Sequence, residues 1–183
     1  MIRSATANDA SALAEIYNHF IRETAVTFEE EPVTAEVMAT RLANVLALDL
    51  PWLVLEQNAR ILGYAYATRW KERSAYRYSV ESTIYLAPEM TGQGHGMTLY
   101  SALIDALMSR AVHAVIGGIS LPNPASIALH EKLGFRPVGS FREVGRKFER
   151  WIDVGYWQLL LKPETPQPTG ANRLRTSASL PRA

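Results

Sequence analysis

The sequence contains no cysteine in its 183 residues. This absence excludes disulfides, thiolate metal sites and a cysteine nucleophile, and it fits a cytoplasmic protein. Histidines are few and lack the spacing of metal ligands, so we expect no bound metal. The four are His19, His95, His113 and His130. The formal net charge is only +1, so nothing in the charge balance indicates binding to nucleic acid.

Long apolar runs are missing as well. No run approaches the roughly 18 residues of a membrane-spanning helix, and the N-terminus lacks the basic and apolar segments of a signal peptide. Apolar residues still make up 48% of the chain, which is typical of a globular protein. We expect one domain over residues 1–162. Residues 163–183 are rich in proline, serine and arginine and cannot bury enough surface to fold alone, so we expect a tail without a catalytic role.

Apolar periodicity predicts a mixed order of strands and helices. Strands are expected at residues 2–5, 52–56, 61–68, 78–86, 114–120, 135–148 and 153–161. Helices are expected after Thr6, after Thr34 with Met38, Leu42, Val45 and Leu46 facing inward, from Met97 to Arg110, and after Asn123. Thr34 and Asn123 are helix-capping residue types, and a proline follows Asn123 at the first helical position. This order predicts an α/β (α+β) domain in which helices pack on a sheet.

A glycine-rich loop connects the strand that ends at Leu86 to the helix that begins at Met97. It contains Gly92, Gly94 and Gly96. Unpaired amides at a helix start, together with the helix dipole, form a seat for phosphate. A Walker loop is excluded because no lysine follows the glycines, and the G-x-G-x-G spacing does not match a dinucleotide-binding fold. From the glycines alone, a flexible turn is the more common explanation.

The segment T-G-Q-G-H-G resembles the Q/R-x-x-G-x-G/A pyrophosphate loop of the GNAT superfamily of N-acetyltransferases, which bind acetyl-CoA. Thr91 stands where that pattern has glutamine or arginine, but such loops bind mainly through backbone amides. Five further segments resemble the phosphinothricin N-acetyltransferase family: I-Y-N-H, W-K-E-R-S-A-Y, V-E-S-T-I-Y-L, H-E-K-L-G-F and D-V-G-Y-W-Q-L. The resemblance implies the GNAT acetyltransferase fold, a mixed, mainly antiparallel sheet that splays at its central strand and carries helices on both faces.

The resemblance also implies positions for acetyl-CoA. Backbone groups of Ile84, Tyr85 and Leu86 would meet the acetyl group and the pantetheine arm where the central strand bulges, with the Leu86 N–H as oxyanion donor. The pyrophosphate would lie on the loop formed by Gly92, Gln93, Gly94, His95, Gly96 and Met97. Asn123 would contact the pantetheine, although a helix cap alone explains this residue equally well.

Glu81 is the candidate general base. From the strand pattern alone, a solvated, outward-facing glutamate is an equal explanation, but the match to V-E-S-T-x-Y favours the base. Partial burial would raise the pKa of Glu81 toward neutral and improve it as a base. The resemblance places His130 near the thioester as a polariser or acid, although a histidine on the side of a helix is nearly as common. Tyr100 is a weaker candidate for the acid and is more typical of the core.

The basic loop before the central strand predicts the acceptor site. Lys71 and Arg73, with Tyr76 nearby, could surround anionic groups, and arginine can hold a carboxylate or phosphinate through two parallel hydrogen bonds. A solvated surface loop is the ordinary alternative. Further acceptor contacts are expected from Val26, Phe28, Thr83 and Tyr85, and Lys147 and Trp151 match the family and would close the site.

Together these features predict an acetyl-CoA-dependent N-acetyltransferase that acts on small glutamate analogues, namely phosphinothricin, methionine sulfoximine or arsinothricin, and so confers resistance. One alternative keeps the chemistry but changes the acceptor to another amine or a protein N-terminus. A second alternative is a non-catalytic acyl-CoA sensor. The resemblance also implies a homodimer, and we expect no nucleic acid or membrane partner.

Overall fold

A computed structural model describes residues 1–161 of the chain, which form a seven-stranded sheet in the order β1-β2-β3-β4-β5-β7-β6. The strands are β1 (Ile2–Ser4), β2 (Trp52–Gln57), β3 (Arg60–Arg69), β4 (Ser79–Leu86), β5 (Ala114–Ser120), β6 (Arg136–Lys147) and β7 (Arg150–Leu160). The helices are α1 (Ala10–Glu23), α2 (Ala35–Ala47), α3 (His95–Met108) and α4 (Pro124–Lys132). The predicted tail, residues 163–183, lies outside the described residues, so the division of the chain stays a prediction.

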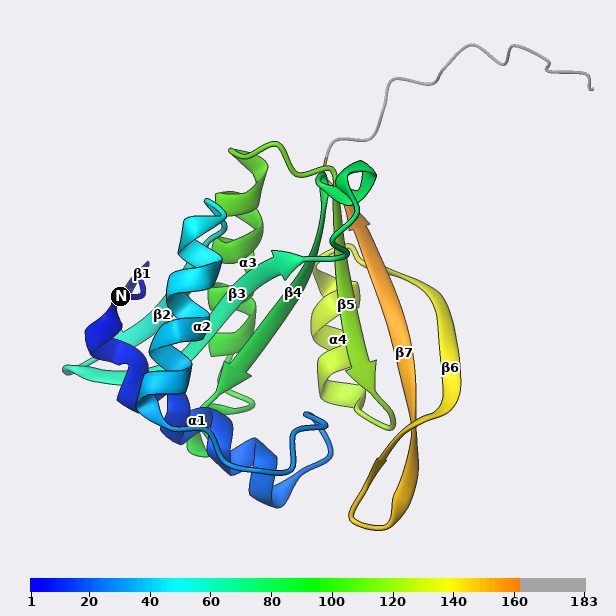
Figure 1. The fold of residues 1–183 in the computed structure, drawn as a ribbon, viewed down its shortest axis with the longest axis horizontal. Coiled ribbons are helices and arrows are strands. Elements are labelled where there is room, and N and C mark those ends of the chain that lie inside the picture. The colour runs from blue at the N-terminus through cyan, green and yellow to red at the C-terminus, as the bar shows by residue number, and fades with distance from the viewer. Residues whose placement is uncertain (162–183) are drawn as a thin grey trace, which may run out of the picture.

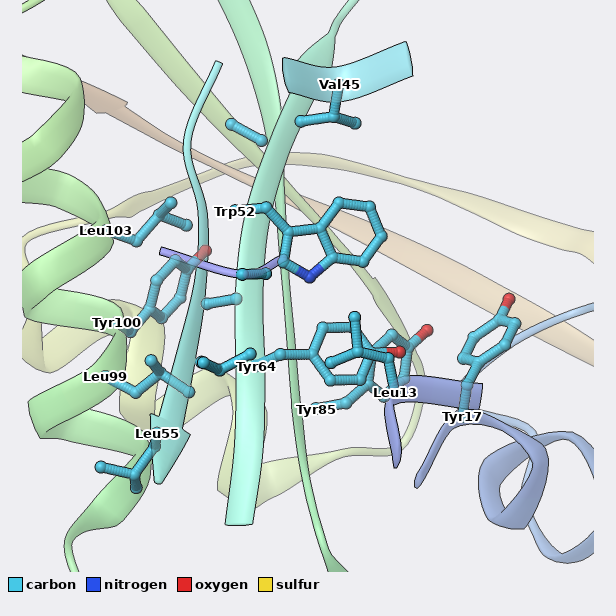
Figure 2. Packing of buried hydrophobic residues seen from close by; sticks show 14 of the residues in the cluster. Leu13, Tyr17, Val45, Trp52, Leu55, Tyr64, Tyr85, Leu99, Tyr100 and Leu103 are labelled. Atoms are coloured by element: carbon cyan, nitrogen blue, oxygen red, sulfur yellow. The ribbon is translucent and has the colours of Figure 1, made fainter. Parts of the chain in front are cut away.

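Helices cover both faces of the sheet. Figure 1 shows α1 and α2 in front of it and α3 and α4 behind it. Figure 2 shows the core that results: Trp52, Tyr64 and Tyr85 project from the strands, and side chains of α1 and α3 approach from opposite sides. Trp52 and Tyr64 are almost fully buried. The expected fold, with helices on both faces of a mixed sheet, is therefore confirmed.

The predicted helix caps are present. The Thr34 hydroxyl accepts a hydrogen bond from the Val37 amide at 3.3 Å, and the Asn123 Oδ1 accepts one from the Ser126 amide at 3.1 Å. Each satisfies an amide that the first helical turn leaves without a partner. These two caps fix where α2 and α4 begin, and α4 begins at the edge of the site described below.

One residue of α2 was assigned to the wrong face. Leu46 is 43% exposed, whereas Met38, Leu42 and Val45 are buried. Leu46 follows Val45 directly, and consecutive residues of a helix point about 100° apart, so both cannot lie in the same narrow apolar stripe. The prediction of an inward-facing Leu46 is wrong for this reason.

β4 and β5 separate part-way along their length. They pair in parallel over only three residues each, ending at Glu81 and Ile116, whereas β4 stays paired with β3 as far as Leu86. Figure 1 shows the two strands diverging toward the bottom of the view. The prediction of a splayed sheet is confirmed, but the expected bulge in β4 is wrong. The register between β3 and β4 is continuous from Val80 to Leu86, so the gap arises because β5 turns away.

No helix within residues 1–161 is long and apolar enough to cross a membrane. The same residues contain no group of three or more histidine or acidic side chains that could hold a metal ion.

Candidate active site

A chamber opens where β4 and β5 separate. Its walls come from the loop between α1 and α2, from β4, from β5 and from α4. The lining residues are Val26, Thr27, Phe28, Glu81, Ser82, Thr83, Ile84, Tyr85, Gly118, Ile119, Ser120, Asn123, Ser126 and His130. Four of the predicted acceptor contacts, Val26, Phe28, Thr83 and Tyr85, therefore line the same chamber as the predicted base Glu81.

The Glu81 side chain points to the α1 side of the sheet. Side chains of a strand alternate between the two faces of the sheet, so Tyr85, four residues after Glu81, lies on the same face. The Tyr85 ring packs against Tyr17 of α1 with ring centroids 5.1 Å apart. The Glu81 carboxylate lies over Gly118 of β5, because a Cβ built on this glycine would be 3.2 Å from Oε1. Burial raises the pKa of Glu81, and the positive charge of Lys71 opposes this shift. Glu81 is therefore a stronger base than an exposed glutamate.

β4 also turns free amides toward the gap. The Ala87 amide donates to the Leu62 carbonyl oxygen of β3 at 2.8 Å. Because amides of an antiparallel strand alternate in direction, the Tyr85 amide faces β3 and the amides of Ile84 and Leu86 face away from it. Two hydrogen-bond donors thus face the place that β5 has left. They could stabilise a developing oxyanion, whereas the Tyr85 amide is already used within the sheet.

A groove leads from the chamber to the glycine loop. It is lined by Phe20, Val26, Ile84, Tyr85, Leu86, Thr91, Gly92, Gly94, Gly96, Met97, Asn123, Ala125, Ser126, Ala128, Leu129 and Lys132. Gly92 and Gly94 have φ values of 73° and 84°, which glycine adopts without strain. Two predicted contacts, Gln93 and His95, do not line the groove. The Gln93 side chain instead braces the loop by donating to the Glu89 carbonyl oxygen at 2.7 Å.

The contribution of α4 to this groove was not predicted. Four of its lining residues, Ala125, Ala128, Leu129 and Lys132, recur at the spacing of one helical face. The small side chains of the two alanines leave space in the groove, and Lys132 adds a positive charge. The spacing was present in the sequence, but it indicates a helix face without showing whether a sheet or a ligand covers it.

A buried hydrogen-bond network borders the chamber from the opposite face of the sheet, and three of its members, Ser82, Ser126 and His130, also line the chamber. His130 is 4% exposed, and its Nδ1 donates to the Ser126 carbonyl oxygen at 2.8 Å. Its Nε2 lies 3.0 Å from the Tyr100 hydroxyl, which in turn lies 2.6 Å from the Ser82 hydroxyl. Ser82 Oγ also lies 3.2 Å from the Ile116 carbonyl oxygen. The network therefore links α4 and α3 to both strands where their pairing ends, because Ile116 is the last paired residue of β5 and Ser82 follows the last paired residue of β4.

Burial favours the neutral form of His130, although the hydrogen bond to Ser126 opposes this effect. Burial lowers the pKa of His130, and a carbonyl oxygen can only accept, so the neutral ring carries its proton on Nδ1 and accepts from Tyr100 at Nε2. Gly117 of β5 makes room for the ring, because a Cβ built there would be 2.5 Å from Nε2. Nothing in the sequence singled out Ser82 as a member of this network.

Lys71 and Tyr76 line a neighbouring hollow instead of the chamber. This hollow is lined by Trp70, Lys71, Tyr76, Ser79, Ile116, Val138, Gly139, Ser140, Phe141, Tyr156 and Gln158. Tyr156 lies between the chamber and this hollow. A Cβ built on Gly118 would be 3.4 Å from the Tyr156 ring, and the Glu81 carboxylate lies over the same glycine. Burial and the charge of Glu81 raise the pKa of Tyr156. Arg73 lines neither site, and Trp70 and Tyr156 were not predicted.

Comparison with known proteins agrees with this geometry. A family model described as an acetyltransferase (GNAT) domain matches residues 2–155. The chain therefore belongs to the GNAT acetyltransferase family, and both the fold and the class of enzyme expected from the sequence are confirmed.

Two related enzymes and one solved structure show which kind of acetyltransferase this chain resembles. The chain is 40% identical over 168 residues to phosphinothricin N-acetyltransferase of Streptomyces viridochromogenes, covering 91% of each. It is 37% identical over 160 residues to an L-methionine sulfoximine/L-methionine sulfone acetyltransferase of Salmonella typhimurium, covering 87% of this chain and 94% of the relative. A phosphinothricin acetyltransferase from Sinorhizobium meliloti, solved in complex with acetyl-CoA, shares the fold with a TM-score of 0.87 and 34% identity over 96% of each chain.

Proposed function

We propose that this protein transfers the acetyl group of acetyl-CoA to the amino group of a small glutamate-like amino acid. The observation that carries the proposal is the gap between β4 and β5, where Glu81, the amides of Ile84 and Leu86, and the glycine groove meet. The names of the relatives support phosphinothricin and methionine sulfoximine as acceptors. Arsinothricin is a third glutamate analogue of the same kind, and acetylation of such inhibitors would confer resistance.

The groove suits acetyl-CoA by the chemistry of its lining. The residues from Gly92 to Met97, at the N-terminus of α3, would hold the diphosphate, because amides there carry partial positive charge. Lys132 adds a full positive charge to the same groove, and Leu86 and Leu129 offer apolar surface to the pantetheine arm. Asn123 uses its Oδ1 to cap α4, which leaves its amide nitrogen for a ligand. Acetyl-CoA supplies the activated thioester for the reaction.

Glu81 and the free amides divide the chemistry between them. Glu81 takes a proton from the acceptor ammonium, directly or through a water molecule, and leaves an amine that can attack the thioester. The amides of Leu86 and Ile84 stabilise the negative charge that develops on the carbonyl oxygen. CoA then departs as the thiolate, the attacking nitrogen loses a proton as it becomes an amide, and the thiolate takes a proton from that nitrogen or from water. No covalent bond to the protein forms at any stage.

Lys71 is the proposed partner of the acceptor's anionic end. It lies close enough to Glu81 to lower the pKa of that carboxyl, so it can attract a second negative charge at the same place. Tyr76 shares the hollow with Lys71, while Phe28 and Thr83 line the chamber itself. Arg73 belongs to the same loop and stays a proposed acceptor contact.

His130 receives a different role from the one that the family resemblance implied. Both of its ring nitrogens are engaged, one with Ser126 and the other with Tyr100. We propose that His130 supports the gap from behind, through Tyr100 and Ser82, and does not act on the thioester directly.

We also propose that the protein is a cytoplasmic homodimer. β6 is an edge strand of the sheet, and its apolar side chains Val138, Phe141 and Val144 are 60%, 59% and 55% exposed. Exposed apolar rows of this kind mark surfaces that bind another protein. Light scattering during size-exclusion chromatography should give twice the mass of one chain, and a monomeric mass at micromolar concentration would reject the dimer.

Steady-state kinetics with purified protein tests the proposed activity. Release of the CoA thiol would be followed with phosphinothricin, methionine sulfoximine, arsinothricin, glutamate and a peptide that begins with alanine. We expect a glutamate analogue to exceed the peptide in kcat/KM by about tenfold or more, the ratio that 1.4 kcal/mol of selective binding provides. Turnover of the peptide alone would instead indicate protein acetylation, and CoA binding without any turnover would indicate the acyl-CoA sensor.

A further inference from the structure

One wall of the chamber is a loop without regular secondary structure. Residues 24–33 connect α1 to α2, and three of them, Val26, Thr27 and Phe28, line the chamber opposite Glu81. A segment without a backbone ladder of its own depends on side-chain contacts for its position. The contacts that hold this loop therefore also determine the width of the chamber.

On its outer side the loop is held by α1 and α2. The Thr27 hydroxyl lies 2.7 Å from the Tyr17 hydroxyl, and Tyr17 donates to Glu29 at 3.0 Å. Arg41 of α2 binds both carboxylate oxygens of Glu29, at 2.8 and 3.0 Å. These contacts fix the loop to its own helices and leave open what holds it against the chamber.

On its inner side the loop meets the far end of β6. Residues 136–144 of this strand are exposed, but Gly145 and Lys147 are buried. The pairing of β6 with β7 is irregular between Phe141 and Gly145. Within that irregular segment Glu143 has a φ of 53°, and its amide donates to the Asp153 carboxylate at 2.7 Å. A bulge of this kind bends and twists a strand, so it turns the end of β6 toward the loop.

Two contacts join the end of β6 to the loop. The Lys147 Nζ donates to the Thr27 carbonyl oxygen at 2.8 Å, 120 residues away in sequence, and Lys147 is only 3% exposed. The Phe28 ring rests on Gly145, because a Cβ built there would be 2.3 Å from the ring carbon Cε2. Lysine is rarely buried without a partner, and a charged donor makes a stronger hydrogen bond than a neutral one. Lys147 therefore differs from an ordinary surface lysine, because it is buried and its charged ammonium group donates a hydrogen bond to the loop.

We propose that the end of the β6–β7 hairpin holds the loop of residues 24–33 in place and thereby determines which acceptors the chamber admits. Lys147 is a positioning residue that holds Thr27, and Gly145 is a specificity-determining position because its missing side chain leaves the space that Phe28 occupies. The inference rests on the proposed function, since it concerns the acceptor side of the same chamber. It predicts that changes in β6 alter acceptor binding much more than acetyl-CoA binding, because Val26 is the one residue of this loop that also lines the groove.

Lys147→Met tests the positioning role, because methionine keeps an unbranched apolar stem and removes the donor. Its matched control is Arg146→Met, the neighbouring residue, which is exposed. We expect faster amide hydrogen exchange in peptides covering residues 24–33 and an acceptor KM raised about tenfold, the effect of one lost hydrogen bond to a charged group. The KM for acetyl-CoA should stay within about twofold of the original value. Arg146→Met should change neither quantity.

Gly145→Ala tests the specificity role and remains informative if Lys147→Met fails to fold. Its control is Arg142→Ala on the same strand, where the side chain is exposed. Gly145→Ala should push Phe28 into the chamber and raise the acceptor KM, again without a change for acetyl-CoA, whereas Arg142→Ala should behave like the original protein.

Hydrogen exchange separates failure of this inference from failure of the proposed function. If exchange in residues 24–33 is the same in Lys147→Met as in the original protein, the positioning role is wrong, whatever the kinetics show. An equal loss for acceptor and acetyl-CoA in Gly145→Ala would overturn the specificity role. A protein that turns over no acceptor would contradict the proposed function, while faster exchange in Lys147→Met would still support the contact between hairpin and loop.

Discussion

Replacing Glu81 by glutamine should make the enzyme slower and the protein more stable. The substitution keeps the size of the side chain and removes its ability to accept a proton. A positioned general base contributes about 10²–10⁴-fold to a rate, so kcat/KM should fall by this factor, equivalent to about 3–5 kcal/mol of transition-state stabilisation. The Glu81 carboxylate lies in the chamber beside Gly118, and the neutral amide leaves the backbone donors at Leu86 in place.

The gain in stability follows from the direction of the pKa shift. Burial raises the pKa of Glu81 above its ordinary value of 4.5, so the folded state disfavours the carboxylate relative to the unfolded chain. The contribution of this group to folding is therefore most favourable below pH 4.5 and is lost as pH rises through the raised pKa. At pH 7.5 Glu81→Gln should have a higher Tm than the original protein, and the difference should shrink toward pH 4.

Two assays decide this prediction. Thiol release at saturating acetyl-CoA, measured from pH 5 to 9, gives the rate and its dependence on a basic group, and thermal unfolding over the same range gives the Tm. A variant that keeps more than about one third of the original kcat/KM, with the same pH profile, would refute the assignment of the base. A lower Tm at neutral pH would refute the argument from burial.

Three further predictions concern Lys71, the glycine loop and the buried hydrogen-bond network. Lys71→Met should shift the acidic limb of the kcat/KM profile to higher pH, because Lys71 lowers the pKa of Glu81; an unmoved limb would contradict this. Gly96→Val should raise the KM for acetyl-CoA by about tenfold or more and spare the acceptor KM, since a Cβ on Gly96 already lies 3.4 Å from a groove side chain. Tyr100→Phe should cost about 1–3 kcal/mol in urea denaturation because it leaves the buried His130 Nε2 unpaired; an unchanged midpoint would dismiss the network.

Local patterns in the sequence predicted most of the fold. The caps at Thr34 and Asn123 and the glycines at Gly92 and Gly94 are found where short-range chemistry requires them. The splay of the sheet came only from the family resemblance. No residue of β4 marks the point where β5 leaves it, because the separation depends on how two distant strands pack against different helices.

The acceptor side shows the limit of reasoning from neighbouring residues. Lys71 and Tyr76 were expected in the chamber because their loop leads into β4, yet they line the adjoining hollow with Tyr156 of β7. The contact from Lys147 to Thr27 spans 120 residues and depends on a bulge that no single residue type announces. Such contacts are set by tertiary packing, and the sequence pattern predicts the elements without their mutual placement.

The most direct test of the account is whether donor and acceptor must be bound together. Initial rates measured at several fixed concentrations of methionine sulfoximine, with acetyl-CoA varied, distinguish the two cases in one data set. A single chamber where the acceptor amine meets the thioester predicts intersecting lines in double-reciprocal form, because both substrates occupy the enzyme before the acetyl group moves. Parallel lines would indicate that the protein itself carries the acetyl group between two separate steps, and that result would contradict the central claim.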